Sequence, residues 1–398
     1  GVNTLRPEIE IESGIYKKLA IKQEAPTMPV GSKELRPHRL RVALFDISGD
    51  SLVKRKSVAL DIAGALTDVT ELQGEKVADL VLINDGDLTY AKLRFDERSI
   101  ATLKSHLGGL NEPLARALIW ASLWDSVRDG ELSASDYIAI ALNALGTESD
   151  ISIVSATNTN IETAIWHYAA PAHRAALRAK VSDALNKFLK ASAAGSDHQL
   201  AFARGFAESA ATPEQSQEIV EILNGSIKGL TVDAELRWHL VICAVKRGLL
   251  GASDIDAELA KDNTAHGKQY GALAHAAIPT AGAKEKAFKA VTSEKLSNTI
   301  HAYTCRGFNV AMQSELLTPY VDQYFAILID LWTTAGYEIA ETTATMLFPS
   351  FVVSQETLAK AQKWIDVTGK DAPSALRRVI IEGRDGLARS LRAQSKDA

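Results

Sequence analysis

The histidines are the first residues to test for chemistry, because a helix-borne zinc hydrolase carries His-Glu-x-x-His, with two imidazoles one turn apart. The sequence has nine histidines, but none is followed by Glu and no two lie four positions apart. His167 and His173, the nearest pair, are six positions apart, which does not place them on one helical face. With two lone cysteines, Cys243 and Cys305, no zinc site is visible. We therefore predict no catalytic residue, no metal ligand and no cofactor in this chain.

Other catalytic motifs are also absent. A serine hydrolase elbow would read Gly-x-Ser-x-Gly, and a phosphate-binding loop Gly-x-x-x-x-Gly-Lys-[Ser/Thr]. Neither pattern occurs, and there is no Gly-x-Gly-x-x-Gly. Paired carboxylates such as Asp254 and Asp256 fall where a helix is expected to start, and acids there complement the helix dipole. The chain thus offers no recognisable site for hydrolysis or nucleotide binding.

Composition and net charge indicate the class of protein and exclude some kinds of partner. The 398 residues are 46% hydrophobic and 23% charged, which is ordinary for globular domains with ample cores. A net charge of −5 and a pI near 6.0 argue against nucleic acid as a partner. No apolar run is long enough to span a membrane, so we expect no membrane partner. Two distant cysteines favour a reducing cytoplasm and a role as buried, structural thiols.

The first part of the chain has the period of β-strands. Apolar and charged residues alternate in the run 39–44, Ser48-Gly49-Asp50 supplies a turn, and a second alternating run covers 52–60. This pattern predicts a hairpin. Shorter strands are expected over 69–72 and 77–83. We therefore predict a small antiparallel β-sandwich domain spanning residues 1–83.

The rest of the chain, residues 84–398, has a helical period near 3.6 with frequent caps and short breaks. Trp120 and Trp124 lie one turn apart and should share a packing partner. Ser196-x-x-Gln199 and Thr212-x-x-Gln215 resemble capping boxes. Many short antiparallel helices cannot close on one core. The expected fold is therefore mainly α: the sandwich followed by a HEAT-like α-solenoid of paired antiparallel helices, a helical-repeat C-terminal domain.

Several segments resemble one family, the aminopeptidase N enzymes of actinobacteria, which are zinc metallopeptidases of the gluzincin group. The motif Leu82-Ile83-Asn84-Asp85-Gly86-Asp87 resembles that family's junction between its β-sandwich and its ERAP-like helical domain. Further resemblances follow in the same order along the chain: Trp124–Glu131, Asp254–Thr264, Leu317–Phe325 and Ala375–Gly386. The opening Gly1–Leu5 resembles the exit from the catalytic domain and lacks an initiator Met, so we expect a processed or expressed fragment.

The resemblance implies a function that this chain would serve without catalysing anything itself. In the family, the helical domain caps the chamber around the zinc site and controls peptide access, while a separate domain removes N-terminal amino acids. The zinc helix and the Gly-Ala-Met-Glu-Asn substrate loop are both missing here, since none of the three Met precedes Glu. The implied partners are the parent polypeptide's catalytic domain, with its zinc, and peptide substrates. We expect the chain to be inactive alone.

Two arginines are candidates for the substrate channel. Arg204 and Arg306 recur in the same tripeptide, Arg-Gly-Phe, and arginine suits a peptide carboxylate. The alternative is that each only packs or caps a helix. Two further readings of the whole chain stay open: a stand-alone helical-repeat scaffold for protein–protein interaction, and an independent enzyme with an unrecognised site.

Overall fold

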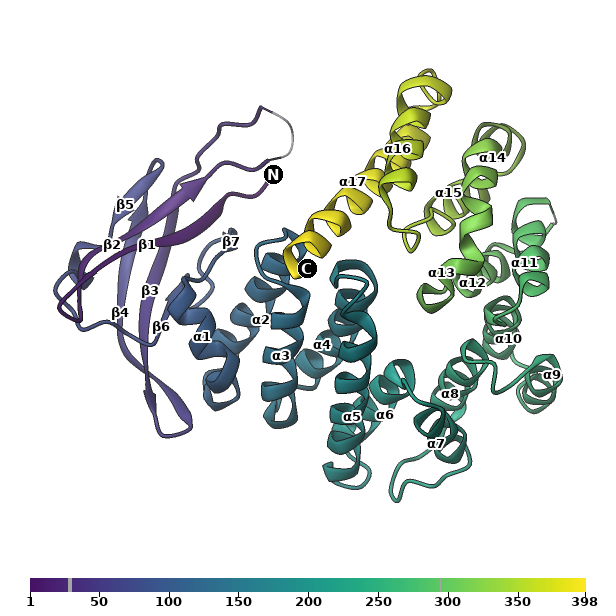
Figure 1. The fold of residues 1–398 in the computed structure, drawn as a ribbon, viewed down its shortest axis with the longest axis horizontal. Helices are drawn as coiled ribbons and strands as arrows, with labels where there is room; N and C mark the ends of the chain where they lie inside the picture. Colours follow the sequence, from purple (N-terminus) through teal and green to yellow (C-terminus); the bar gives the residue numbers. More distant parts are fainter. Residues whose placement is uncertain (28–30, 294) are drawn as a thin grey trace. The chain divides into compact units, whose positions relative to one another are not determined.

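The structure is a computed structural model that describes residues 1–27, 31–293 and 295–398. The chain divides into two compact units, Gly1–Ile161 and Glu162–Ala398. The first unit holds the strands and the first helices, and the second is helical (Figure 1). The predicted class, mainly α with a small antiparallel β region at the front, is confirmed. Among the described residues, no helix has the length and apolarity needed to cross a membrane.

Two sheets face each other in the first unit. One has the strand order β5-β2-β1-β7 and the other β4-β3-β6, with every pair antiparallel except β1 and β7. Their inner faces bury a shared core that includes Leu19 on β2, Leu40 and Val42 on β3, and Ile83 on β6. The strands are β1 Thr4–Glu12, β2 Ile15–Glu24, β3 His38–Ser48, β4 Ser51–Ile62, β5 Leu66–Asp68, β6 Leu80–Ile83 and β7 Lys92–Leu93.

The predicted hairpin is present as β3 and β4, and Gly49 takes the positive φ of 60° that its turn requires. The strand expected over 69–72 is wrong, because Thr70–Leu72 forms a 3₁₀ turn instead. Val69 and Leu72 are both buried, so this turn serves to place two apolar side chains in the core. The strand expected over 77–83 is shorter than predicted and forms β6.

Three helices complete the first unit, and a fourth leads out of it: α1 Glu97–His106, α2 Pro113–Arg128, α3 Ala134–Ala144 and α4 Ile151–Thr163. Trp120 and Trp124 share Tyr137 as their packing partner, with ring centroids 6.3 and 5.4 Å away, as the spacing predicted. Helices α1 and α2 also contact strands β6 and β7. The compact units therefore divide inside α4, whereas the predicted domain limit after residue 83 marks a change of secondary structure and stays a prediction as a domain boundary.

The second unit is a succession of helices: η4 Ala164–Tyr168, α5 Arg174–Ala191, α6 Asp197–Ser209, α7 Pro213–Leu223, α8 Ala234–Lys246, α9 Ala252–Lys261, α10 Ala265–Ala277, α11 Ala281–Ser293, α12 Asn298–Phe308, η5 Ala311–Gln313, α13 Ser314–Leu317, η6 Thr318–Tyr320, α14 Val321–Thr334, α15 Tyr337–Met346, α16 Gln355–Lys363, η7 Trp364–Thr368 and α17 Ser374–Asp397. Helices α6, α8, α10 and α12 lie side by side in that order (Figure 1). Every second helix of this stretch therefore lies in one row, which fits an arrangement of helix pairs. The HEAT-like repeat class stays a prediction.

Caps and closing contacts hold this unit together. Thr212 and Gln215 form the predicted capping box. Ser196 caps α6, but the Gln199 side chain accepts from Gly195 N, so that box is incomplete. At the far end, the Asp397 carboxylate accepts from Ala170 N at 2.9 Å, which ties α17 to the segment after η4. The last helix of the unit thus contacts its first elements.

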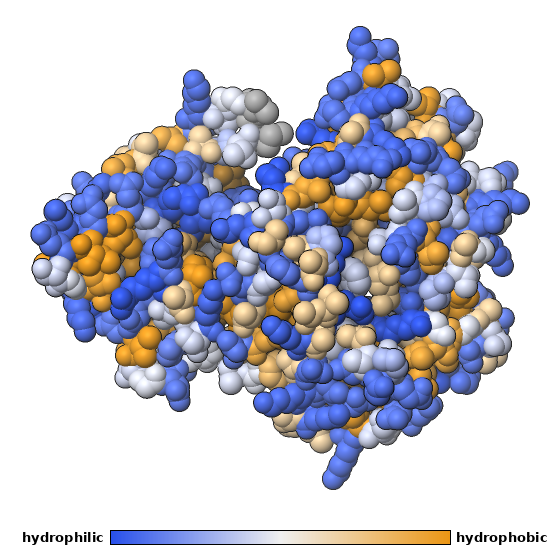
Figure 2. Space-filling model, viewed as in Figure 1, coloured by the Kyte–Doolittle hydropathy of each residue, from blue (hydrophilic) through white to orange (hydrophobic). Residues whose placement is uncertain are grey.

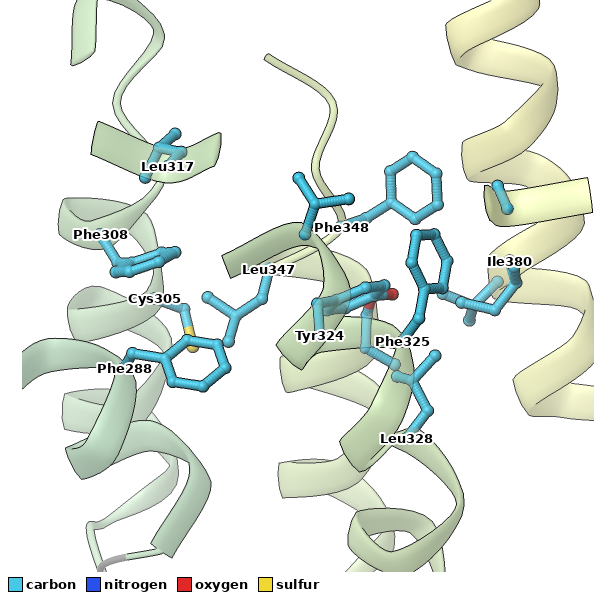
Figure 3. Close-up of a cluster of buried hydrophobic side chains, with 14 of the residues drawn as sticks. Phe288, Cys305, Phe308, Leu317, Tyr324, Phe325, Leu328, Leu347, Phe348 and Ile380 are labelled. Atoms are coloured by element: carbon cyan, nitrogen blue, oxygen red, sulfur yellow. The ribbon is translucent and has the colours of Figure 1, made fainter. Parts of the chain in front are cut away.

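A large apolar core fills the later part of the second unit. Phe288 on α11, Phe308 on α12, Tyr324 on α14 and Phe348, which follows α15, converge on it (Figure 3). The Tyr324 hydroxyl donates to the Ala344 carbonyl at 2.5 Å, which satisfies its polar end inside the core. Polar and charged residues cover most of the visible surface, with apolar residues in small groups among them (Figure 2).

Candidate functional site

The two arginines predicted from the sequence lie on one row of side chains. We call this the arginine–tyrosine row, and it comprises Arg204 on α6, Glu235 on α8, Tyr270 on α10, and Tyr303 and Arg306 on α12. These four helices are the ones that lie side by side. The row therefore results from helix packing, because its members are about one helical pair apart in the sequence.

Contacts connect the row from end to end. The Arg204 guanidinium lies 3.5 Å from a Glu235 carboxylate oxygen, and the Tyr270 hydroxyl donates to the other oxygen at 3.0 Å. The rings of Tyr270 and Tyr303 are 5.7 Å apart, and Arg306 sits over the Tyr303 ring at 5.0 Å. Burial and the Glu235 carboxylate raise the pKa of Tyr270. Both arginines are thus held by aromatic or acidic neighbours.

The arginines still have capacity for a ligand. Arg306 is exposed, and the Arg204 side chain is 38% exposed. Among the described residues, Nε of Arg204 is buried and has no hydrogen-bond partner. A ligand from solvent would therefore contact the exposed parts of the two side chains, and an exposed guanidinium suits a planar anion such as a carboxylate. The geometry is therefore compatible with the predicted role, which the structure leaves as a prediction.

A pocket of about 440 Å³ opens beside the row, with Glu235, Trp238, Asp262, His266 and Tyr270 among its walls. Trp238 stacks on Tyr270 at 6.1 Å and donates from Nε1 to Asp262 at 2.8 Å. Its ring is almost completely buried, so it forms a fixed wall.

A second group of ionisable side chains adjoins the row on helices α6 and α8. Glu208 lies one turn after Arg204 on α6, while His239, Cys243 and Lys246 follow Glu235 along α8. The Lys246 ammonium is 3.0 Å from both Glu208 carboxylate oxygens. We call these four residues the Glu208 cluster.

The ionisation of the Glu208 cluster follows from its enclosure. Burial opposes charge on Glu208, but Lys246 and His239 lower the pKa of its carboxyl to about 2. Burial alone would lower the pKa of Lys246, and the Glu208 carboxylate raises it instead. Burial and the charge of Glu208 raise the pKa of the nearby Glu162 carboxyl to about 7. Glu208 and Lys246 therefore form an ion pair at neutral pH.

Lys284 on α11 is completely buried and has no carboxylate partner among the described residues. Its ammonium donates to the carbonyls of Ala276, Gly307 and Phe308 at 2.9, 3.1 and 2.9 Å. These carbonyls lie at the ends of α10 and α12, where helices leave acceptors unpaired. Burial, with a smaller contribution from Lys246, lowers the pKa of Lys284 to about 7.

The structure also reveals a set of metal-type ligands that the sequence search missed. Ligand atoms of Glu208, His239 and Cys243 all lie within 4.8 Å of one another. The signal available was His-x-x-x-Cys, which puts both residues on one helical face. That signal is weak, because His301 and Cys305 have the same spacing. The predicted burial of both free cysteines is confirmed.

Comparisons with known proteins place the chain among relatives. Residues 80–389 match the family model described as the ERAP1-like C-terminal domain. Over 406 aligned residues, the chain is 44% identical to aminopeptidase N of Streptomyces lividans, covering 100% of this chain and 47% of that protein. Among solved structures, aminopeptidase A of Legionella pneumophila in complex with aspartic acid matches with a TM-score of 0.56 at 11% identity. That match covers 97% of this chain and 49% of the other, so the chain spans about half the length of these relatives.

Proposed function

The chain belongs to the ERAP1-like C-terminal domain family, and from that membership we propose that it is the non-catalytic C-terminal portion of a zinc aminopeptidase. In this proposal it caps the active-site chamber and controls which peptides reach it, while the catalytic domain of the same polypeptide removes N-terminal amino acids. The observation that carries the proposal is the 44% identity to an aminopeptidase N along the whole chain. The two buried, free cysteines are compatible with a cytoplasmic location.

The sequence lacks the zinc motif, which is consistent with a separate catalytic domain that cleaves the peptide. His-Glu-x-x-His does not occur in the 398 residues, so the zinc would be held by another part of the parent protein. No finding favours the alternative of a stand-alone scaffold. Within the chain, the arginine–tyrosine row is the surface that we propose contacts the peptide.

A chimera tests the capping role. The region of the Streptomyces aminopeptidase N that matches this chain is replaced by the chain, and a second protein lacks the region altogether. We expect the chimera to discriminate between short and long peptides, measured as the ratio of kcat/KM values. The truncated protein should lose that discrimination, and equal ratios in both proteins would show that the chain does not control access.

The role of the row is tested in the same chimera. Arg204→Gln and Arg306→Gln should raise KM for a peptide with a free carboxylate by about tenfold, the value of one charge-assisted hydrogen bond. The amidated peptide should be affected much less. Arg378→Gln is the control, because Arg378 is exposed and pairs with Glu382 within α17. Equal effects on both peptides would remove the row from carboxylate recognition.

A further inference from the structure

The Glu208 cluster combines three kinds of metal ligand in one place. His239 and Cys243 face the same side of α8, with Nε2 and Sγ 3.7 Å apart, and Glu208 approaches from α6. Zinc-type ions bind such atoms at about 2.0–2.3 Å, which places tetrahedral ligands about 3.5 Å apart. Since these ligand atoms all lie within 4.8 Å, side-chain movements of about 1 Å would suffice to close around an ion.

We propose that Glu208, His239 and Cys243 form a binding site for a divalent transition-metal ion of the zinc or cobalt type. Imidazole nitrogen, thiolate sulfur and carboxylate oxygen are a ligand set that such ions accept, whereas magnesium and calcium prefer oxygen alone. Three protein ligands leave the fourth position to water. The proposal departs from the expectation that the chain holds no metal ligand.

Binding must displace two existing interactions. Lys246 has to release the Glu208 carboxylate, and its side chain, 19% exposed, has a route toward solvent. Nε2 of His239 donates to the Arg204 carbonyl at 3.2 Å, so metal binding through Nε2 breaks this hydrogen bond. The neutral ring must then carry its proton on Nδ1, which frees the lone pair of Nε2 for the ion. The Cys243 thiol binds the ion as a thiolate, and its proton passes to the solvent. Lys246 is therefore a competitor of the metal, and removing it should strengthen binding.

The chain contains its own control pair. His301 and Cys305 have the same spacing on α12, with Nδ1 and Sγ 3.9 Å apart. Nε2 of His301 instead contacts the Val291 carbonyl and the Thr343 hydroxyl, each at 3.0 Å. Within the described residues, Glu208, His239 and Cys243 are the one such group of three potential ligands. A site that needs the carboxylate therefore forms at the first pair and not at the second.

Cobalt titration of the reduced, chelator-treated 398-residue chain tests the site through the thiolate-to-cobalt absorption band. We expect a saturable band at one ion per chain, lost in Cys243→Ser and retained in Cys305→Ser. Glu208→Gln should weaken cobalt binding at least about tenfold, and zinc should displace the cobalt. No band in the unsubstituted chain, or a band that survives Cys243→Ser, overturns the proposal.

A variant that is expected to bind cobalt more tightly distinguishes a specific effect on the site from a general loss of folding. Lys246→Met should bind cobalt several-fold more tightly, because it removes the cation that competes for Glu208. Circular dichroism checks that each variant is folded. If Cys243→Ser fails to fold, unchanged or weaker cobalt binding by folded Lys246→Met overturns the proposal.

Discussion

Lys246 on α8 and Lys284 on α11 are both enclosed lysines of the second unit, but their partners differ. Lys246 faces the Glu208 carboxylate, and its pKa is raised. Lys284 faces three carbonyls, and burial lowers its pKa to about 7. Two differences act in the same direction: Lys246 lies beside a full negative charge and keeps some exposure, whereas Lys284 is completely buried among carbonyl groups. One lysine forms an ion pair, and the other is a donor that joins two helix ends.

Replacing the joining donor should have the largest effect on stability. Lys284→Ala leaves the carbonyls of Ala276, Gly307 and Phe308 without their donor and opens a cavity. The variant no longer has to bury an ammonium group, and this gain offsets part of the loss. We therefore expect the free energy of unfolding to fall by about 3 kcal/mol. Denaturant unfolding measures it. The exposed Lys286 on the same helix supplies the control, Lys286→Ala, and equal losses in both variants would contradict the role of Lys284.

Breaking the ion pair should cost less. Glu208→Gln removes the charge that compensates Lys246, but the Glu208 side chain is 33% exposed and the Lys246 side chain 19%. Water therefore screens part of the loss, and we expect about 2 kcal/mol, below the range for a fully buried pair. Thermal or denaturant unfolding without added metal gives the value. The exposed Glu221→Gln is the control, and an effect of Glu208→Gln no larger than that of the control would show the pair to be unimportant.

The two lysines also predict a dependence of stability on pH. With its folded pKa near 7, against an ordinary value of 10.5, Lys284 binds fewer protons in the folded state than in the unfolded state between these values. Stability therefore rises with pH through this window, by about 1.5 kcal/mol from about pH 7 to about pH 8.5. The measurement is the unfolding free energy of the unsubstituted chain minus that of Lys284→Met, which cancels other titrating groups. A flat difference would contradict the lowered pKa.

Local features of this fold could be predicted from the sequence, because both partners lie within a few residues of each other or repeat with the helical period. The β3–β4 hairpin, the box of Thr212 and Gln215, and the shared packing partner of Trp120 and Trp124 are of this kind, although the identity of that partner, Tyr137, came only from the structure. The strand expected over 69–72 was wrong because the spacing of its apolar residues, Val69 and Leu72, also fits a 3₁₀ turn that buries both side chains.

The site could be predicted only in part. Arg204 and Arg306 were proposed as candidates from the sequence, and their role stays a prediction. The row that connects them was not foreseen, because Glu235 and Tyr270 come from other helices. Glu208 and Lys246 are likewise brought together only by the packing of α6 against α8. A spacing rule within one helix finds the His-x-x-x-Cys pair on α8, and it finds the pair on α12 equally well. Only the packing of α6 against α8 brings a carboxylate, that of Glu208, beside the pair on α8.

The smallest expected effect tests whether the two lysines influence each other. The charge of Lys246 contributes to the lowered pKa of Lys284. Lys246→Met should therefore raise the pKa of Lys284 and move its stability rise to higher pH. Apart from the loss of the ion pair with Glu208, this changes the contribution of Lys284 to stability at about pH 7.5 by less than about 1 kcal/mol. The pH profiles of Lys246→Met and of the double variant with Lys284→Met, subtracted from each other, isolate this coupling. A profile that does not move would mean that burial alone sets the pKa of Lys284, and the two regions would then be independent.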